Sequence, residues 1–93
     1  MPPIWDAHAF KHHLTRSDLT EVILHANYRS EVETESDGTI VVFIGKSHEL
    51  NDAEIEVLVK QFDDGRPAII FHGMALGEKF SQYREERPDG WIN

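Results

Sequence analysis

Residues 66–80 read Arg-Pro-Ala-Ile-Ile-Phe-His-Gly-Met-Ala-Leu-Gly-Glu-Lys-Phe. The apolar run in this stretch is too short for a typical helix and is rich in β-branched and aromatic residues, so it predicts a strand over residues 67–72, buried on both faces. His72 ends the run, and glycines and then a helix over about residues 77–86 follow it. We expect a functional site at this point, because an ionisable side chain stands where a buried strand ends.

Three more strands are predicted upstream. Residues 28–35 alternate in polarity and place acidic side chains on one face, and residues 39–45 are apolar on both faces, which is typical of a central strand. Ile55, Val57 and Val59 mark the third strand. The glycine-containing turns at residues 36–38 and 63–65 are of hairpin length, so we expect an antiparallel meander.

Two helices are predicted before the strands. Asp6 is a candidate N-cap, and Trp5 and Phe10 are spaced to pack as a hydrophobic staple on a short helix over about residues 6–13. Thr15 and Asp18 resemble a capping box that starts a second helix, which runs to about residue 25. The predicted fold class is therefore α+β, with two N-terminal helices, a four-stranded antiparallel meander sheet, a C-terminal helix, and the helices on one face of the sheet.

Length and composition predict a single small domain over residues 1–93. Its tail, residues 87–93, is a candidate flexible segment, although we expect Trp91 and Ile92 to pack on the body or on a partner. The chain has no cysteine, so it forms no disulfide and offers no thiolate to a metal. The N-terminus lacks the pattern of a signal peptide and no apolar run is long enough to span a bilayer, which predicts a cytoplasmic protein without membrane contacts.

The charge balance is strongly acidic. The chain carries 17 acidic and 9 basic residues and a formal net charge of −8. Attraction to nucleic acid usually requires a basic surface, so we expect no binding to double-stranded DNA by this protein on its own. An acidic surface instead favours a basic protein partner.

The histidines allow a zinc hypothesis. His8 and His12 are four residues apart on the first predicted helix, and His72 could approach them to complete three imidazole ligands. No His-Glu-x-x-His motif supports this arrangement, and the ordinary interpretation is that His8 covers a helix end. We therefore expect no metal and no other cofactor.

A second hypothesis is metal-independent cleavage of RNA. This reaction needs a base for the 2′-hydroxyl, an acid for the leaving oxygen and a cation for the phosphorane, and histidine suits the first two roles because its pKa is near neutral. The ordinary interpretation is a polar pair between the first helix and the last strand. The candidates are His12, His72 and Lys79 for catalysis, and Lys11, Arg29 and Arg84 for binding phosphate or RNA.

Several short motifs together resemble a known family. They are Trp5-Asp6, Lys11-His12, Leu14-Thr15, Ile44-Gly45, Ile70-Phe71-His72-Gly73-Met74 and Lys79-Phe80. Their order resembles the toxins of bacterial toxin–antitoxin pairs, in particular the BrnT-like branch of the RelE superfamily and its actinobacterial relatives. The resemblance implies an α+β fold with a curved antiparallel sheet, a cofactor-free endoribonuclease and neutralisation by a cognate antitoxin. It matches His12 and Lys11 to the first helix of the family, His72 to the end of its last strand, and Lys79 to the basic position of its final helix.

Two positions depart from the family pattern. His13 stands where the family has a glycine, and residues 74–77 lack the arginine that would bind phosphate in a bidentate way. The resemblance therefore implies either a divergent toxin with weak activity or a protein that keeps the fold without the chemistry.

The alternative function is a non-catalytic module that binds a protein through a sheet edge or through the acidic face of Glu31, Glu33 and Glu35. The usual role of such a face is only solvation. A positive cleft around His72 would favour the nuclease, whereas carboxylates around it, such as Glu78, would favour the module.

Overall fold

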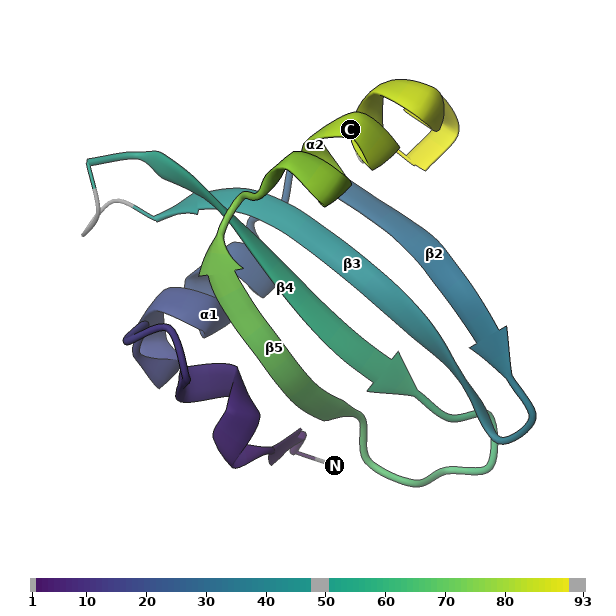
Figure 1. Cartoon of the computed structure of the whole chain (residues 1–93). Coiled ribbons are helices and arrows are strands. Elements are labelled where there is room, and N and C mark those ends of the chain that lie inside the picture. Colours follow the sequence, from purple (N-terminus) through teal and green to yellow (C-terminus); the bar gives the residue numbers. More distant parts are fainter. Residues whose placement is uncertain (1, 48–50, 91–93) are drawn as a thin grey trace.

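The computed structural model describes residues 2–47 and 51–90. The elements in chain order are β1 (Ile4–Trp5), the 3₁₀ helix η1 (Ala7–Phe10), α1 (Arg16–Leu24), β2 (Tyr28–Glu35), β3 (Gly38–Ser47), β4 (Ala53–Gln61), β5 (Ile69–Ala75), α2 (Glu78–Glu86) and the 3₁₀ helix η3 (Pro88–Gly90). The sheet has the order β1-β5-β4-β3-β2, in which β1 runs parallel to β5 and all other neighbours are antiparallel (Figure 1).

The predicted four-stranded antiparallel sheet is wrong, because β1 adds a fifth, parallel strand at the β5 edge. The Ile4 amide donates to the Ala68 carbonyl at 2.8 Å, and the Asp6 amide donates to the Ile70 carbonyl at 2.9 Å. A strand of two residues is too short to show a period of two, so its sequence carries no strand pattern. Only its pairing with β5 defines it.

The prediction of an α-helix over residues 6–13 is also wrong, because this stretch forms only the four-residue 3₁₀ helix η1. Asp6 does cap it, and Trp5 stacks on Phe10 with ring centroids 5.7 Å apart. His13 then adopts a φ of +66°, and Thr15 is extended as the N-cap of α1. The N-cap at Asp6 and the break at His13 leave too few residues between them for a stable α-helix.

The prediction of α1 is confirmed, including its N-terminal signal. The Asp18 amide donates to Thr15 Oγ1 at 3.1 Å, and the Thr15 amide donates to Asp18 Oδ2 at 2.8 Å. This reciprocal pair is a capping box that satisfies two backbone amides at the start of the helix. The Ser47 hydroxyl also donates to Asp18 Oδ1 and so ties the helix start to β3.

The two α-helices lie on opposite faces of the sheet, not on one face as predicted (Figure 1). Because β3 is apolar on both faces, it can hold both of them. Leu19 and Val22 of α1 belong to one core with Val41 and Phe43. Phe80 of α2 belongs to the other core, with Tyr28, Val42 and Ile44.

His72 does not end its strand, contrary to prediction, because β5 continues to Ala75. Gly73 is buried, and a Cβ atom built there would lie 2.4 Å from Leu19 Cδ2. The glycine therefore lets α1 pack closely on β5 and does not terminate the strand.

The expectation that Trp91 and Ile92 pack on the body falls outside the described residues. Neither α1 nor α2, each nine residues long, could cross a membrane, and the described ranges contain no other helix that could.

Candidate functional site

His72 is held by a buried carboxylate. Its Nε2 lies 3.0 Å from Oε2 of Glu56, while the Gly77 amide donates to Oε1 of the same carboxylate at 2.7 Å. The Glu56 side chain is 4% exposed and that of His72 is 25% exposed. Glu56 on β4 thus joins β5 to the start of α2 and fixes the orientation of the imidazole.

His12 completes the cluster, which we call the His–Glu site: His12, His72 and Glu56. The His12 and His72 rings meet edge to face with centroids 5.8 Å apart. His12 is exposed and follows η1, which packs against β5. The fold therefore brings together two imidazoles that are 60 residues apart in the chain, as the nuclease hypothesis requires.

The two candidate lysines are exposed. Lys11 precedes His12 and is the C-cap of η1. Lys79 is the second residue of α2, and its Nζ lies 5.2 Å from the centroid of the Phe80 ring. Both remain candidates for binding phosphate.

The two candidate arginines have partners outside the His–Glu site. Arg84 forms an ion pair with Glu54, and this hydrogen-bonded pairing raises the pKa of the Arg84 guanidinium above its usual value. Arg29 contacts Gln61 and lies 5.7 Å from the centroid of Phe43, a ring in the core under α1 and so on the other face of the sheet.

The zinc hypothesis does not gain a third ligand. His8 Nδ1 lies 2.7 Å from Oδ1 of Asp6, and its side chain is 81% exposed. The hydrogen bond from the His8 amide is the main cause that lowers the pKa of Asp6, and the hydrogen bond with the His8 ring is the second cause. Over residues 2–47 and 51–90, no three metal-binding side chains lie together.

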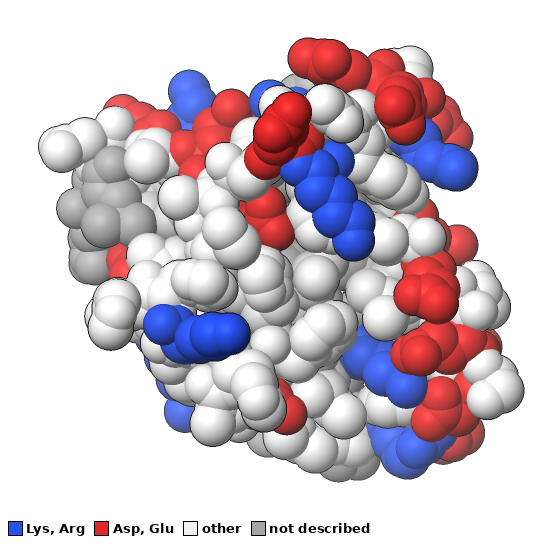
Figure 2. Space-filling view, viewed as in Figure 1, with Lys and Arg blue, Asp and Glu red and all other residues white. Residues whose placement is uncertain are grey.

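The surface around the site is not a positive cleft. Figure 2 shows acidic groups along β2 and over α2, an uncharged centre over the sheet, and basic groups mixed with acidic ones near the start of α2. Glu56 itself contacts His72. The charge distribution thus favours the binding module, whereas the geometry of the two histidines favours catalysis.

Glu56 is the site residue that the sequence did not reveal. It alternates with apolar residues in β4, which is the pattern of a solvated strand face. The link between β4 and β5 is too long to fix the register from turn type. Glu56 lies on the face of β4 opposite Ile55 and Val57, and His72 of β5 lies on the same face as Glu56. This position on the strand is the signal that could have identified Glu56 as a site residue.

Comparisons with models of protein families, with curated proteins and with solved structures found no match to this chain. The likeness to BrnT-like toxins therefore rests on the short motifs alone.

Proposed function

We propose that this protein is a toxin-like endoribonuclease that cleaves single-stranded RNA without a metal, with weak activity. The observation that carries the proposal is the contact between His12 and His72, in which His72 is oriented by a buried carboxylate. Two imidazoles within reach of one phosphodiester can supply both the acid and the base.

In the proposed reaction, His72 removes the proton from a 2′-hydroxyl. The 2′-oxygen forms a bond to phosphorus while the bond from phosphorus to the 5′-oxygen breaks, and His12 gives its proton to that leaving oxygen. Glu56 stabilises the imidazolium that His72 becomes, which is why we assign His72 as the base. The products are a 2′,3′-cyclic phosphate and a free 5′-hydroxyl.

Lys79 and Lys11 are the cations proposed to hold the phosphate. Both are exposed, and a lysine provides a single point of charge where the related family uses a bidentate arginine. Weak stabilisation of the phosphorane and a net charge of −8 are the reasons for expecting slow cleavage.

The test is an assay with purified protein, EDTA and a short single-stranded RNA. Cleavage should leave a cyclic phosphate and should stop when the nucleotide before the scissile bond is 2′-deoxy. His12→Ala and His72→Ala should each lower the rate by about 10²- to 10⁴-fold. His25→Ala is the matched control, because His25 is an exposed histidine at the end of α1.

Folded wild-type protein that leaves the RNA intact would reject the proposal. So would cleavage that persists in the His12→Ala/His72→Ala double variant, since a contaminant would then be responsible.

The second candidate is a protein-binding module, and the observation that favours it is the edge strand β2. In the described sheet β2 pairs only with β3, and Glu31 and Glu33 on it are exposed. A basic strand of a partner could pair with this edge and neutralise its charge.

Hydrogen exchange tests this second function. A synthetic peptide of alternating lysine and valine should protect the β2 amides from exchange, and Glu33→Lys should weaken that protection. Unchanged exchange of the β2 amides would argue against this function.

A further inference from the structure

Helix α2 covers only one end of its face of the sheet. Phe80 belongs to a core with Tyr28, Val42 and Ile44, which are buried. Ile40 lies two residues before Val42 on β3 and therefore points to the same face, but it is half-buried and lies outside this core. The sheet thus continues past α2 on this face, as Figure 1 also shows.

Strand register extends this uncovered part across the sheet. Ile40 pairs with Lys60 of β4, which pairs with Ile69 of β5. Ile69 pairs in turn with Ile4 of β1. Residues directly opposite each other in a sheet point to the same face, so four side chains form one row, which we call the open row: Ile4, Ile69, Lys60 and Ile40.

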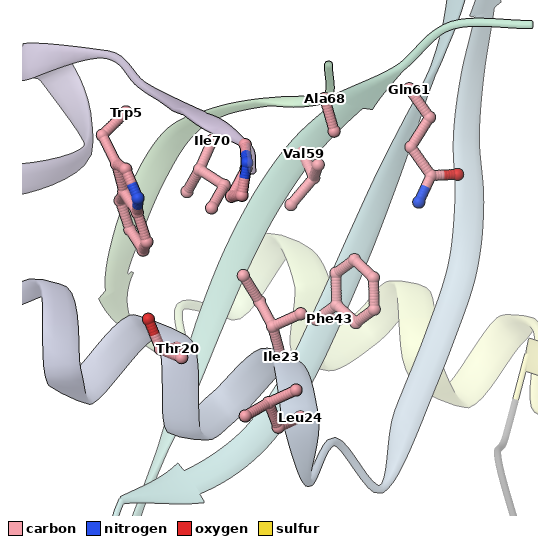
Figure 3. Close-up of a pocket in the computed structure, with 10 residues that line it drawn as sticks. Trp5, Thr20, Ile23, Leu24, Phe43, Val59, Gln61, Ala68 and Ile70 are labelled. Carbon is pink, nitrogen blue, oxygen red and sulfur yellow. The ribbon is translucent and has the colours of Figure 1, made fainter. Parts of the chain in front are cut away.

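The neighbouring pair on β4 and β5 supports this assignment of faces. Val59 pairs with Ile70, and Figure 3 shows both side chains on the side of the sheet that faces α1. Successive residues of a strand point to opposite faces, so Lys60 and Ile69 point away from α1.

The open row is mainly apolar and accessible. Ile4 is 50% exposed, and it is one of two exposed large apolar side chains among the described residues, the other being Leu24 of α1. The charge of Lys60 is paired, because its Nζ lies 3.0 Å from both Glu35 and Asp37. Figure 2 accordingly shows an uncharged centre over the sheet. Apolar side chains gathered on a surface mark contact with another molecule.

Acidic side chains border the open row and select its occupant. Glu33 pairs with Ile40, and Glu35 contacts Lys60, so both lie at the β2 end of the row. Both glutamates are exposed, and Figure 2 shows further acidic groups over α2. A partner that covers the row therefore needs an apolar strip flanked by basic side chains.

A helix is the element that fits such a surface. The covered parts of this sheet are covered by α1 on one face and by α2 on the other, whereas a partner strand would add at an edge. A second copy of the chain does not supply the helix, because α1 and α2 already bury their apolar side chains in the two cores. RNA is disfavoured by the acidic border.

We propose that the open row binds an amphipathic helix of a partner protein, with apolar side chains on the row and lysine or arginine opposite Glu33 and Glu35. The proposal does not rest on RNA cleavage. It concerns a face of the sheet, whereas the binding module considered above uses the β2 edge.

Titration of the full chain with a synthetic helix tests this docking. The probe is a short peptide with leucine along one face and lysine on the others, used at about 0.15 M salt so that general attraction is screened. With ¹³C-labelled isoleucine methyl groups, the signals of Ile4, Ile40 and Ile69 should shift. Those of Ile23 and Ile70, on the face of α1, should not. The same peptide with glutamate in place of lysine should bind at least about tenfold more weakly.

Ile4→Glu and Leu24→Glu separate docking from general attraction, because each adds one negative charge at an exposed apolar residue. Ile4→Glu should weaken binding of the lysine peptide about tenfold, since an apolar contact is lost. Leu24 is 70% exposed and lies on α1, across the sheet, so Leu24→Glu should leave the affinity unchanged or raise it (Figure 3). Ile40→Gln repeats the test from β3 and does not depend on the pairing of β1.

Equal weakening by Ile4→Glu and Leu24→Glu would overturn the proposal, and so would full affinity in both Ile4→Glu and Ile40→Gln. Methyl shifts confined to the face of α1, equal binding of the lysine and glutamate peptides, or no binding of the lysine peptide up to about 1 mM would overturn it as well. If oligouridine shifts the three methyl signals and the lysine peptide does not, the open row binds nucleic acid and the proposal is rejected.

Discussion

Glu56 shows how a single buried residue can organise a site. It accepts a hydrogen bond from the Gly77 amide with one oxygen and contacts His72 with the other. A buried carboxylate is costly unless both oxygens are paired, and here both are. Its position therefore fixes β4, β5 and α2 relative to one another and orients the imidazole at the same time.

Glu56→Gln should separate these two roles. Glutamine has nearly the same size and can still accept from the Gly77 amide, so the urea midpoint should stay close to that of the wild type. It carries no charge to stabilise an imidazolium, so kcat for RNA cleavage should fall about 10- to 100-fold with KM unchanged. An unchanged kcat in folded protein would show that Glu56 is structural only.

His13 is the second residue that changes the local structure. Its φ of +66° lies in the left-handed region, which costs a side-chain-bearing residue about 1–2 kcal/mol relative to glycine. This is the position where the family that the motifs resemble has a glycine. The backbone thus has the conformation that a glycine would favour, although the residue is a histidine.

His13→Gly should therefore stabilise the protein. His13 is exposed, so little packing is lost, and after the greater entropy of glycine in the unfolded chain the free energy of unfolding should rise by about 0.5–1 kcal/mol. Urea denaturation measures this change. His25→Gly is the control. It should be destabilising, because the φ of −123° at His25 is one that any residue adopts and glycine then adds only entropy to the unfolded chain. A decrease in the free energy of unfolding for both variants would refute the prediction.

At the scale of elements, ion pairs join the turns at one end of the sheet. Lys60 on β4 lies 3.0 Å from both Glu35 and Asp37, and Arg66 pairs with Asp64 at 2.8 Å. The hydrogen bond from Lys60 is the main cause that lowers the pKa of Asp37, and the bond from Arg66 does the same for Asp64. The Arg66 guanidinium also donates to the Asp37 carbonyl at 3.2 Å and so holds the β2–β3 turn beside the loop between β4 and β5.

The lowered pKa of Asp37 predicts a specific pH dependence. A carboxyl whose pKa is lower in the folded state stabilises the fold above its unfolded pKa of about 3.9, and that contribution is lost as the pH falls through the folded pKa. Lys60→Met should return the pKa of Asp37 toward its ordinary value and so remove the contribution of the Asp37 carboxylate to the free energy of unfolding. An NMR titration of the carboxyl carbons measures the change, and Asp64 is the internal control, since its partner Arg66 is intact; equal shifts at both aspartates would contradict the assignment.

At the scale of the whole molecule, negative charge is in excess. The molecule measures 37 × 29 × 23 Å, so at about 0.01 M salt, where the Debye length is about 30 Å, every acidic group repels most of the others. At about 0.15 M salt the Debye length falls to about 8 Å and this repulsion becomes local.

Added NaCl should therefore raise the thermal midpoint, by about 2–5 °C between these two salt concentrations. Glu33→Lys changes the net charge from −8 to −6 at an exposed position of the acidic edge strand, so it should raise the midpoint at low salt and reduce the salt effect. Glu33→Gln is the intermediate control. A midpoint that falls with salt would mean that the local ion pairs outweigh the net repulsion.

The sequence by itself determined the elements that depend on neighbouring residues. The capping box of Thr15 and Asp18, the alternation in β2 and β4, and the apolar run of β3 are local patterns, and each produced the predicted element. His12 and His72 could be singled out for the same reason, since an imidazole beside an element end is visible in the chain itself.

Tertiary structure alone decided which of these elements meet. The β1 strand exists because it pairs with β5, and β5 continues past His72 because residues 73–75 pair with β4. The choice of opposite faces for α1 and α2, and the placement of Glu56 beside His72, depend on strand register. Register is fixed by contacts between residues far apart in the chain, and such contacts leave no periodic signal in the sequence.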